Sequence, residues 1–63
     1  MTIRYNEEKA LLKIITEDGR IKMYHPIPIV KYWQFMTLRK EKLFGKAWKV
    51  IERYKQPEEF MPW

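Results

Sequence analysis

The chain has no cysteine, a single histidine and only two glycines among its 63 residues. Without cysteine, no disulfide can hold the chain together and no thiolate can bind zinc. A chain of this length buries only about 60% of the surface that its unfolded form exposes, so its core must be built from bulky side chains alone. We therefore predict one small domain over residues 1–56, followed by a C-terminal tail over residues 57–63.

Long apolar runs are also missing. No run approaches the roughly 20 residues that are needed to cross a bilayer. The first residues, MTIRYNEEK, contain no apolar stretch of the length found in signal peptides. These absences predict a cytoplasmic protein that does not act on membranes.

The side chains that most enzymes use for catalysis are scarce. His25 is the only imidazole, and a histidine-dependent nucleophile would have to be one of three threonines. Gly19 and Gly45 are isolated, and neither belongs to a glycine-rich phosphate loop. We predict a protein that is not an enzyme and that uses no metal, cofactor or small-molecule substrate. His25, beside Pro26, is interpreted as the end of a strand rather than as a ligand.

Positive charges and aromatic rings are abundant instead. The formal net charge is +5, and ten residues are aromatic. Between residues 20 and 55, ten lysines and arginines stand against only two acids, Glu41 and Glu52. Such a segment favours anionic partners through long-range attraction and counterion release, although a lysine-rich surface can also serve solubility alone.

Residues 2–25 fit two patterns. As a helix, the segment would begin with Asn6 as N-cap and stop at Gly19. As strands, it would turn at residues 6–9 and again at Asp18-Gly19, which is a strong hairpin signal between apolar runs. We favour the strands, with Ile3 and Tyr5 in the first of three. A two-residue loop at Asp18-Gly19 would place one set of side chains on an apolar face and another on a mixed face: Leu12, Ile14, Ile21 and Met23 on the first, and Leu11, Lys13, Ile15, Lys22 and Tyr24 on the second.

The second half of the chain has helical periodicity. Apolar residues recur at helical spacing from Pro28 to about residue 40, and again from about residue 43 to Tyr54, before Pro57. We expect Trp33 and Trp48 to pack against the apolar face of the sheet. The predicted fold class is therefore α+β, a three-stranded antiparallel meander followed by two helices.

Two groups of residues are candidates for nucleic-acid binding. On the mixed sheet face, Lys13, Lys22 and Tyr24, with Arg20 at the turn, would combine cations that hold phosphate with a ring that stacks on a base. The same ring could instead be covered by the C-terminal segment. On the second helix, four cations follow i, i+4, i+7, i+11 spacing and form a stripe that could lie along a phosphate backbone or be a solvated face: Lys42, Lys46, Lys49 and Arg53.

The sequence thus predicts a small basic binding module whose preferred partner is RNA or other single-stranded nucleic acid. The alternative is a protein-binding regulator, such as a phage-encoded protein that docks on a host enzyme through aromatic anchors. Those anchors would include Trp33, Phe35, Phe60 and Trp63. The tail itself, an acidic pair followed by large apolar residues, is either a docking motif or a cap that folds back on the core. A structural domain that forms oligomers is a third possibility.

Several short motifs follow one another in a fixed order along the chain: Ile3 with Tyr5, Asp18-Gly19, Ile27-Pro28, Gly45-Lys46-Ala47-Trp48, and Ile51 with Tyr54. In this order they resemble the KTSC domain family, a short module found at the C-terminus of some lysyl-tRNA synthetases and as free-standing bacterial or phage proteins. The chain departs from the family at Lys22-Met23-Tyr24, where the family has two tyrosines, and by a one-residue deletion before Ile51. The resemblance implies an α+β domain that binds RNA.

Overall fold

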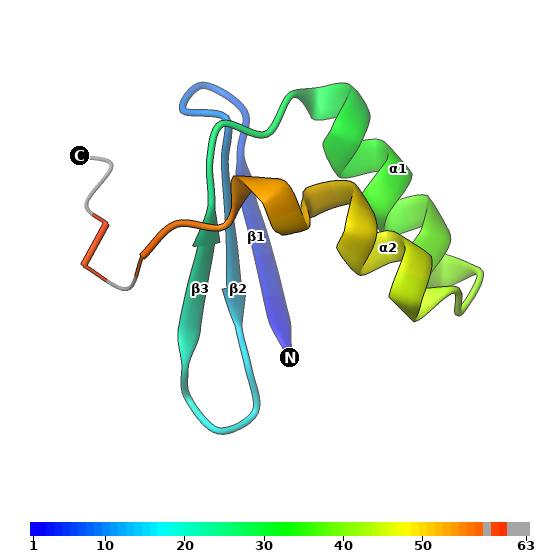
Figure 1. Cartoon of the computed structure of the whole chain (residues 1–63), viewed down its shortest axis with the longest axis horizontal. Coiled ribbons are helices and arrows are strands. Elements are labelled where there is room, and N and C mark those ends of the chain that lie inside the picture. Colours follow the sequence, from blue (N-terminus) through cyan, green and yellow to red (C-terminus); the bar gives the residue numbers. More distant parts are fainter. Residues whose placement is uncertain (58, 61–63) are drawn as a thin grey trace.

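The computed structural model describes residues 1–57, 59 and 60. In this part of the chain, three strands precede the helices: β1 (Thr2–Asn6), β2 (Leu11–Ile15) and β3 (Ile21–Tyr24), then α1 (Ile29–Lys40), α2 (Phe44–Ile51) and a 3-10 helix, η1 (Glu52–Tyr54). The strands form one antiparallel sheet in the order β1-β2-β3, and the two helices lie together to one side of it (Figure 1). The predicted α+β fold, with a meander followed by two helices, is confirmed.

The turn between β1 and β2 lies where the sequence places it. The side-chain oxygen of Asn6 accepts a hydrogen bond from the Lys9 amide at 3.1 Å, and the Ala10 amide donates to the Glu7 carbonyl at 3.2 Å. Ala10 takes a φ of 51°, in the left-handed region. Hydrogen bonds within the turn thus pair the backbone amides of Lys9 and Ala10, and the side chain of Asn commonly accepts such bonds in turns.

The loop between β2 and β3 has three residues, Glu17 to Gly19, rather than the predicted two. The Thr16 amide donates to the Arg20 carbonyl at 2.9 Å, and the Gly19 amide donates to the Thr16 carbonyl at 3.0 Å. Gly19 has a φ of 85°, which suits the left-handed position that closes a three-residue hairpin loop. As a result Ile15 pairs with Ile21, whereas the predicted two-residue loop would pair Thr16 with Ile21, so the predicted register is wrong by one residue.

This shift exchanges the two faces of β3, because successive side chains of a strand point to opposite sides of the sheet. Lys22 and Tyr24 join Leu12 and Ile14 on the face covered by the helices, which we call the inner face. Ile21 and Met23 lie instead on the outer face, and Ile21 is 48% exposed. The complete outer face is formed by Thr2, Arg4, Asn6, Leu11, Lys13, Ile15, Ile21 and Met23.

The core lies between the inner face and the helices. Its buried members are Leu12, Ile14, Tyr24, Ile27, Phe35, Ala47 and Ile51. Trp48 packs at the border of this cluster, with its ring 5.6 Å from that of Phe35 in an edge-on arrangement. Trp33, by contrast, is 60% exposed, so its predicted place in the core is wrong. Phe35 fills that place, and Tyr32 stacks on Tyr5 of β1 with ring centres 4.3 Å apart.

The chain returns to β3 after η1. The His25 amide donates to the Tyr54 carbonyl, and the Gln56 amide donates to the Met23 carbonyl, both at 2.9 Å. The side-chain amide of Gln56 adds a hydrogen bond to the His25 carbonyl at 2.7 Å. Within the tail, the ring of Phe60 lies 5.4 Å from that of His25, whereas positions 58 and 61–63, on which the docking or capping prediction also depends, lie outside the described residues.

Candidate nucleic-acid interface

The structure separates the side chains that were predicted to share the mixed sheet face. Lys13 lies on the outer face, where it is paired directly across the strands with Arg4. Lys22 and Tyr24 lie on the inner face, because of the shifted hairpin register. The predicted surface of Lys13, Lys22 and Tyr24 is therefore wrong as one cluster.

Tyr24 is not available as a stacking ring. Its side chain is 4% exposed and belongs to the core, with its ring 6.4 Å from that of Trp48. Desolvation by burial raises the pKa of its hydroxyl above the ordinary value for tyrosine. A base could stack on this ring only if the core opened, so the predicted role of Tyr24 is wrong for the folded protein.

Lys22 reaches the surface from the inner face. Its ammonium nitrogen lies 5.9 Å from the centre of the Trp48 ring, which places it at the edge of the core beside α2. The long aliphatic stem of a lysine can line apolar surface while its charge remains in water. Lys22 is thus a cation held in position by an aromatic ring.

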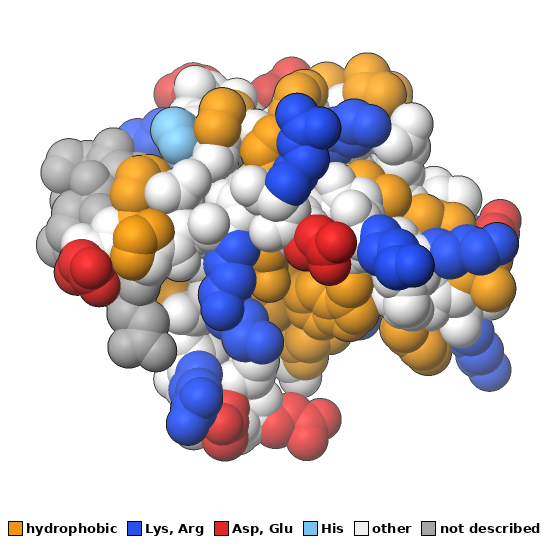
Figure 2. All heavy atoms as spheres, in the orientation of Figure 1, with side chains coloured by type: hydrophobic (Ala, Val, Ile, Leu, Met, Phe, Trp, Pro, Cys, Tyr) orange, Lys and Arg blue, Asp and Glu red, His pale blue; other side chains and the backbone are white. Residues whose placement is uncertain are grey.

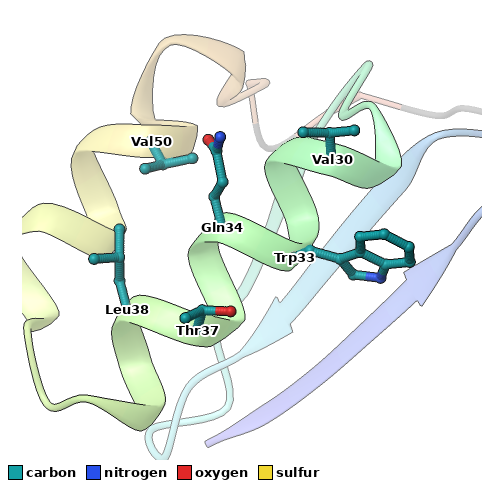
Figure 3. Close-up of a pocket in the computed structure, with 6 residues that line it drawn as sticks. All are labelled: Val30, Trp33, Gln34, Thr37, Leu38 and Val50. Atoms are coloured by element: carbon teal, nitrogen blue, oxygen red, sulfur yellow. The ribbon is translucent and has the colours of Figure 1, made fainter.

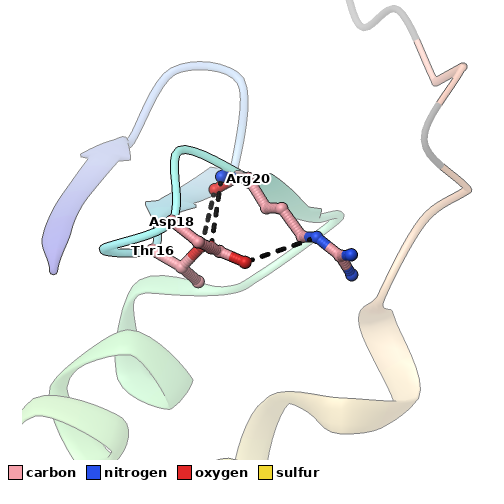
Figure 4. A network of polar contacts seen from close by, with 3 residues as sticks. All are labelled: Thr16, Asp18 and Arg20. Atoms are coloured by element: carbon pink, nitrogen blue, oxygen red, sulfur yellow. Dashed lines mark hydrogen bonds and ion pairs between the residues drawn. The ribbon is translucent and has the colours of Figure 1, made fainter.

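Arg20 lies at the end of the β2–β3 loop, in a small polar network with Thr16 and Asp18 (Figure 4). Its side chain approaches the Asp18 carboxylate at 3.4 Å, and both side chains are mostly exposed. The Thr16 hydroxyl donates a hydrogen bond to the Asp18 carboxylate, and this bond is the main cause of the lowered pKa of Asp18. An exposed ion pair of this kind contributes little to stability, so the Arg20 guanidinium stays accessible to a stronger anionic ligand.

Arg20 and Lys22 meet a third cation, Lys55, which the sequence analysis did not single out. The three line one hollow of about 70 Å³ together with Ile21 and Gln56. This hollow exists because residues 54–56 return along β3, and Lys55 is brought opposite Tyr24 by a bridge between distant parts of the chain. Nothing in the local pattern around Lys55 signals that return.

The predicted helical stripe is continuous only in its middle. Lys46 and Lys49 are exposed on α2, whereas Lys42 lies in the preceding loop with a φ of 63°. Arg53 lies on η1, with its guanidinium carbon 5.0 Å from the Tyr54 ring centre. One helix therefore does not carry all four cations, and the predicted spacing fails at both ends.

We define the basic surface as the cations of the β2–β3 loop, β3, α2, η1 and the returning C-terminal segment: Arg20, Lys22, Lys46, Lys49, Arg53 and Lys55. Figure 2 shows lysine and arginine side chains spread over one side of the molecule, from the β2–β3 loop past the middle to the helices. Apart from Arg20, no member of the basic surface forms an ion pair with a described residue. Phosphate can therefore approach the other five cations without displacing a carboxylate of a described residue.

The part of the chain that the structure describes shows no group of three or more His, Cys, Asp or Glu side chains that could hold a metal ion. Nor does it include a helix long and apolar enough to span a membrane. Comparison with family models, with curated proteins and with solved structures finds no match for the chain. The resemblance to the KTSC domain thus stays a prediction.

Proposed function

We propose that this protein is a small basic module that binds RNA or other single-stranded nucleic acid through the basic surface. The observation that carries the proposal is the convergence of Arg20, Lys22 and Lys55 on one hollow, next to the exposed cations of α2 and η1. These residues come from five separate segments of the chain. Among the described residues only Arg20 of this set is paired with an acid, and a cluster of mostly unpaired cations attracts a polyanion and releases its counterions on binding.

The proposed mode of binding is directed at phosphate. Lysine and arginine side chains position a nucleic-acid strand by its backbone and carry little sequence information. Because Tyr24 is buried, no ring of the predicted site is presented for base stacking. We therefore propose binding that tolerates many sequences, as in other proteins that follow a single strand by its phosphates.

The absence of catalysis and a cytoplasmic location are parts of the same proposal. The scarcity of histidine and cysteine in the sequence supports binding rather than catalysis. The resemblance to the KTSC domain, still a prediction, implies RNA as the partner and so agrees with this class of function.

The test is a titration of fluorescently labelled single-stranded RNA at two salt concentrations. We compare the wild type with the double variant K49E/K55E, in which both changed residues are exposed members of the basic surface. Each phosphate contact contributes about 0.7 to the slope of log affinity against log salt for single strands, so losing two should lower the slope by about 1.4. Affinity at moderate salt should fall by about tenfold or more.

The matched control is R4E/K13E on the outer face, which changes the net charge by the same amount. This control should lose much less affinity and keep the slope of the wild type. If the wild type fails to bind at low salt, or if the two double variants lose affinity equally, the proposal is wrong. Equal losses would show that net charge matters and that the basic surface does not.

A protein-binding regulator remains the alternative, and one observation favours it. Trp33 and Val30 are 60% and 57% exposed one turn apart on the same helix, and neighbouring exposed apolar side chains are a feature of protein contact surfaces. Binding to such a surface would change little with salt, whereas binding to the basic surface would weaken steeply. Salt therefore separates the two functions in one experiment.

A further inference from the structure

A shallow apolar groove runs over α1 and reaches α2. It has a volume of about 410 Å³ and is lined by Val30, Trp33, Gln34, Thr37, Leu38 and Val50 (Figure 3). Val50 extends from α2 toward α1, whereas Trp33 projects from α1 on the side away from α2. None of the six lining residues carries a charge.

Stability of the domain does not account for this groove. Phe35 fills the core at 0% exposure, and Trp33, two positions earlier, is left outside at 60%. Val30 and Trp33 are one turn apart on α1, so these two exposed apolar side chains are neighbours rather than single scattered positions. Contiguous exposed apolar surface on a small domain marks a contact site.

The charges around the groove indicate its partner. The segments that form α1 and α2 contain no acidic residue and five cations: Lys31, Arg39, Lys40, Lys46 and Lys49. Lys40 is one turn beyond Thr37, and Lys46 is one turn before Val50, so by helix geometry a cation borders the groove on each helix. Glu41 directly follows α1 and Glu52 directly follows α2, so the groove is an apolar centre whose border is positive on balance.

We propose that this groove binds an amphipathic helix of a partner protein, with an apolar stripe that covers Trp33 and Val30 and an acidic polar side. Helices dock into apolar grooves through anchors at i, i+3, i+4 and i+7, and a tryptophan is a frequent centre of binding energy. The acids would meet Lys40 and Lys46. The groove shares only Lys46 with the basic surface, and its proposed partner is a protein helix rather than a nucleic acid.

Two other occupants agree less well with the charges. A second copy of this chain would bring the same acid-free helices face to face, and like charges across an interface are unfavourable. A nucleic-acid strand would place phosphate over a centre whose lining residues carry no charge. An acidic amphipathic helix satisfies both the apolar centre and the positive border.

The probe is a synthetic labelled peptide with leucines at i, i+3, i+4 and i+7 spacing and glutamates on its other side. It is titrated against the full chain by fluorescence anisotropy. Trp33→Ala should weaken binding by about tenfold or more, because tryptophan anchors dominate interfaces of this kind. Phe44→Ala is the matched control, since Phe44 is 51% exposed and does not line the groove, and it should leave affinity unchanged.

Charge, periodicity and the apolar anchors are tested with two further peptides and two variants. A peptide of the same composition in scrambled order should not bind, nor should one with lysine in place of glutamate. The double variant K40E/K46E should weaken binding of the acidic peptide. Val30→Asp should also weaken this binding, although Trp33 is unchanged in that variant. Circular dichroism melting confirms that each variant is folded.

The proposal is overturned if the acidic peptide does not bind, if the lysine peptide binds equally well, or if Trp33→Ala and Phe44→Ala have the same effect. Sedimentation gives a further decisive outcome: a dimer that Trp33→Ala dissociates would show that a second copy occupies the groove. RNA binding by Trp33→Ala should equal that of the wild type, so failure of this proposal is distinguishable from failure of the basic surface.

Discussion

At the scale of single residues, Tyr24 is buried in the core, whereas Trp33 is exposed on α1. Tyrosine and tryptophan each combine a large apolar ring with a polar group, so residue type alone does not decide between core and surface. For Tyr24, a one-residue difference in loop length decides the face of the sheet. For Trp33, successive helix positions differ by about 100° of rotation, so Phe35, two positions later, lies about 200° around α1 and is the one that is buried.

The burial of Tyr24 predicts a pH dependence of stability. Desolvation raises the pKa of its hydroxyl in the folded protein, so the unfolded chain loses this proton first as the pH rises. The contribution of Tyr24 to stability is therefore complete below about pH 10, the ordinary tyrosine pKa, and is lost as the pH rises through the higher folded value. Tyr24→Phe has no proton to lose and should lose less stability between pH 8 and pH 11 than the wild type.

Melting temperatures of both proteins at the two pH values provide the measurement. Lysines titrate in both proteins, and so does Tyr5, whose pKa is also raised, mainly by burial. The difference between the two curves therefore isolates Tyr24. Parallel losses in the wild type and in Tyr24→Phe would show that this hydroxyl is not desolvated in the folded state.

At the scale of elements, the sequence predicts which segments form strands and helices better than how they pair. Asp18-Gly19 correctly marks the hairpin, but the signal is compatible with loops of two or three residues. A two-residue loop of the predicted type needs positive φ at both positions, and in the structure Gly19 has it whereas Asp18 does not. The second of the two helices also ends earlier than predicted, at Ile51, with η1 between it and Pro57.

The pairing of β1 with β2 predicts a stabilising charge reversal. Arg4 and Lys13 lie directly opposite each other on the outer face, and neither forms an ion pair with a described residue. Like charges in this position are destabilising, and an opposite pair contributes roughly 0.2–1 kcal/mol. We expect Lys13→Glu to increase the free energy of unfolding in urea by an amount in this range.

Lys46→Glu is the control for that change, because it makes the same reversal on an exposed helix position without a cross-strand partner. It separates the pairing with Arg4 from a general effect of net charge. An unchanged or lower stability of Lys13→Glu relative to Lys46→Glu would contradict the observed register of β1 and β2.

At the scale of the whole molecule, the basic surface depends on the return of the C-terminal segment. The hydrogen bonds of Tyr54 and Gln56 to the end of β3 bring Lys55 next to Arg20 and Lys22. Sequence patterns extend over one helix or one hairpin, so they identified Arg20, Lys22 and the cations of α2 but could not join them with Lys55. The candidate site was predictable as a set of charges and not as a surface.

The net charge predicts how salt acts on the fold and on binding. The formal net charge is +5, and most cations of the basic surface have no acidic partner among the described residues, so folding concentrates like charges. Salt weakens such repulsion, since the Debye length falls from about 30 Å at 0.01 M to about 8 Å at 0.15 M. We expect the melting temperature of the wild type to rise over this range.

The double variant R4E/K13E removes four units of charge, which takes the formal net charge from +5 to +1, so its melting temperature should rise less. A melting temperature that falls with salt, or an equal rise in both proteins, would show that repulsion between cations does not limit stability. The same range of salt should weaken RNA binding, because phosphate contacts release counterions. Since salt should stabilise the folded protein, a loss of RNA binding over this range reports on the basic surface and not on unfolding.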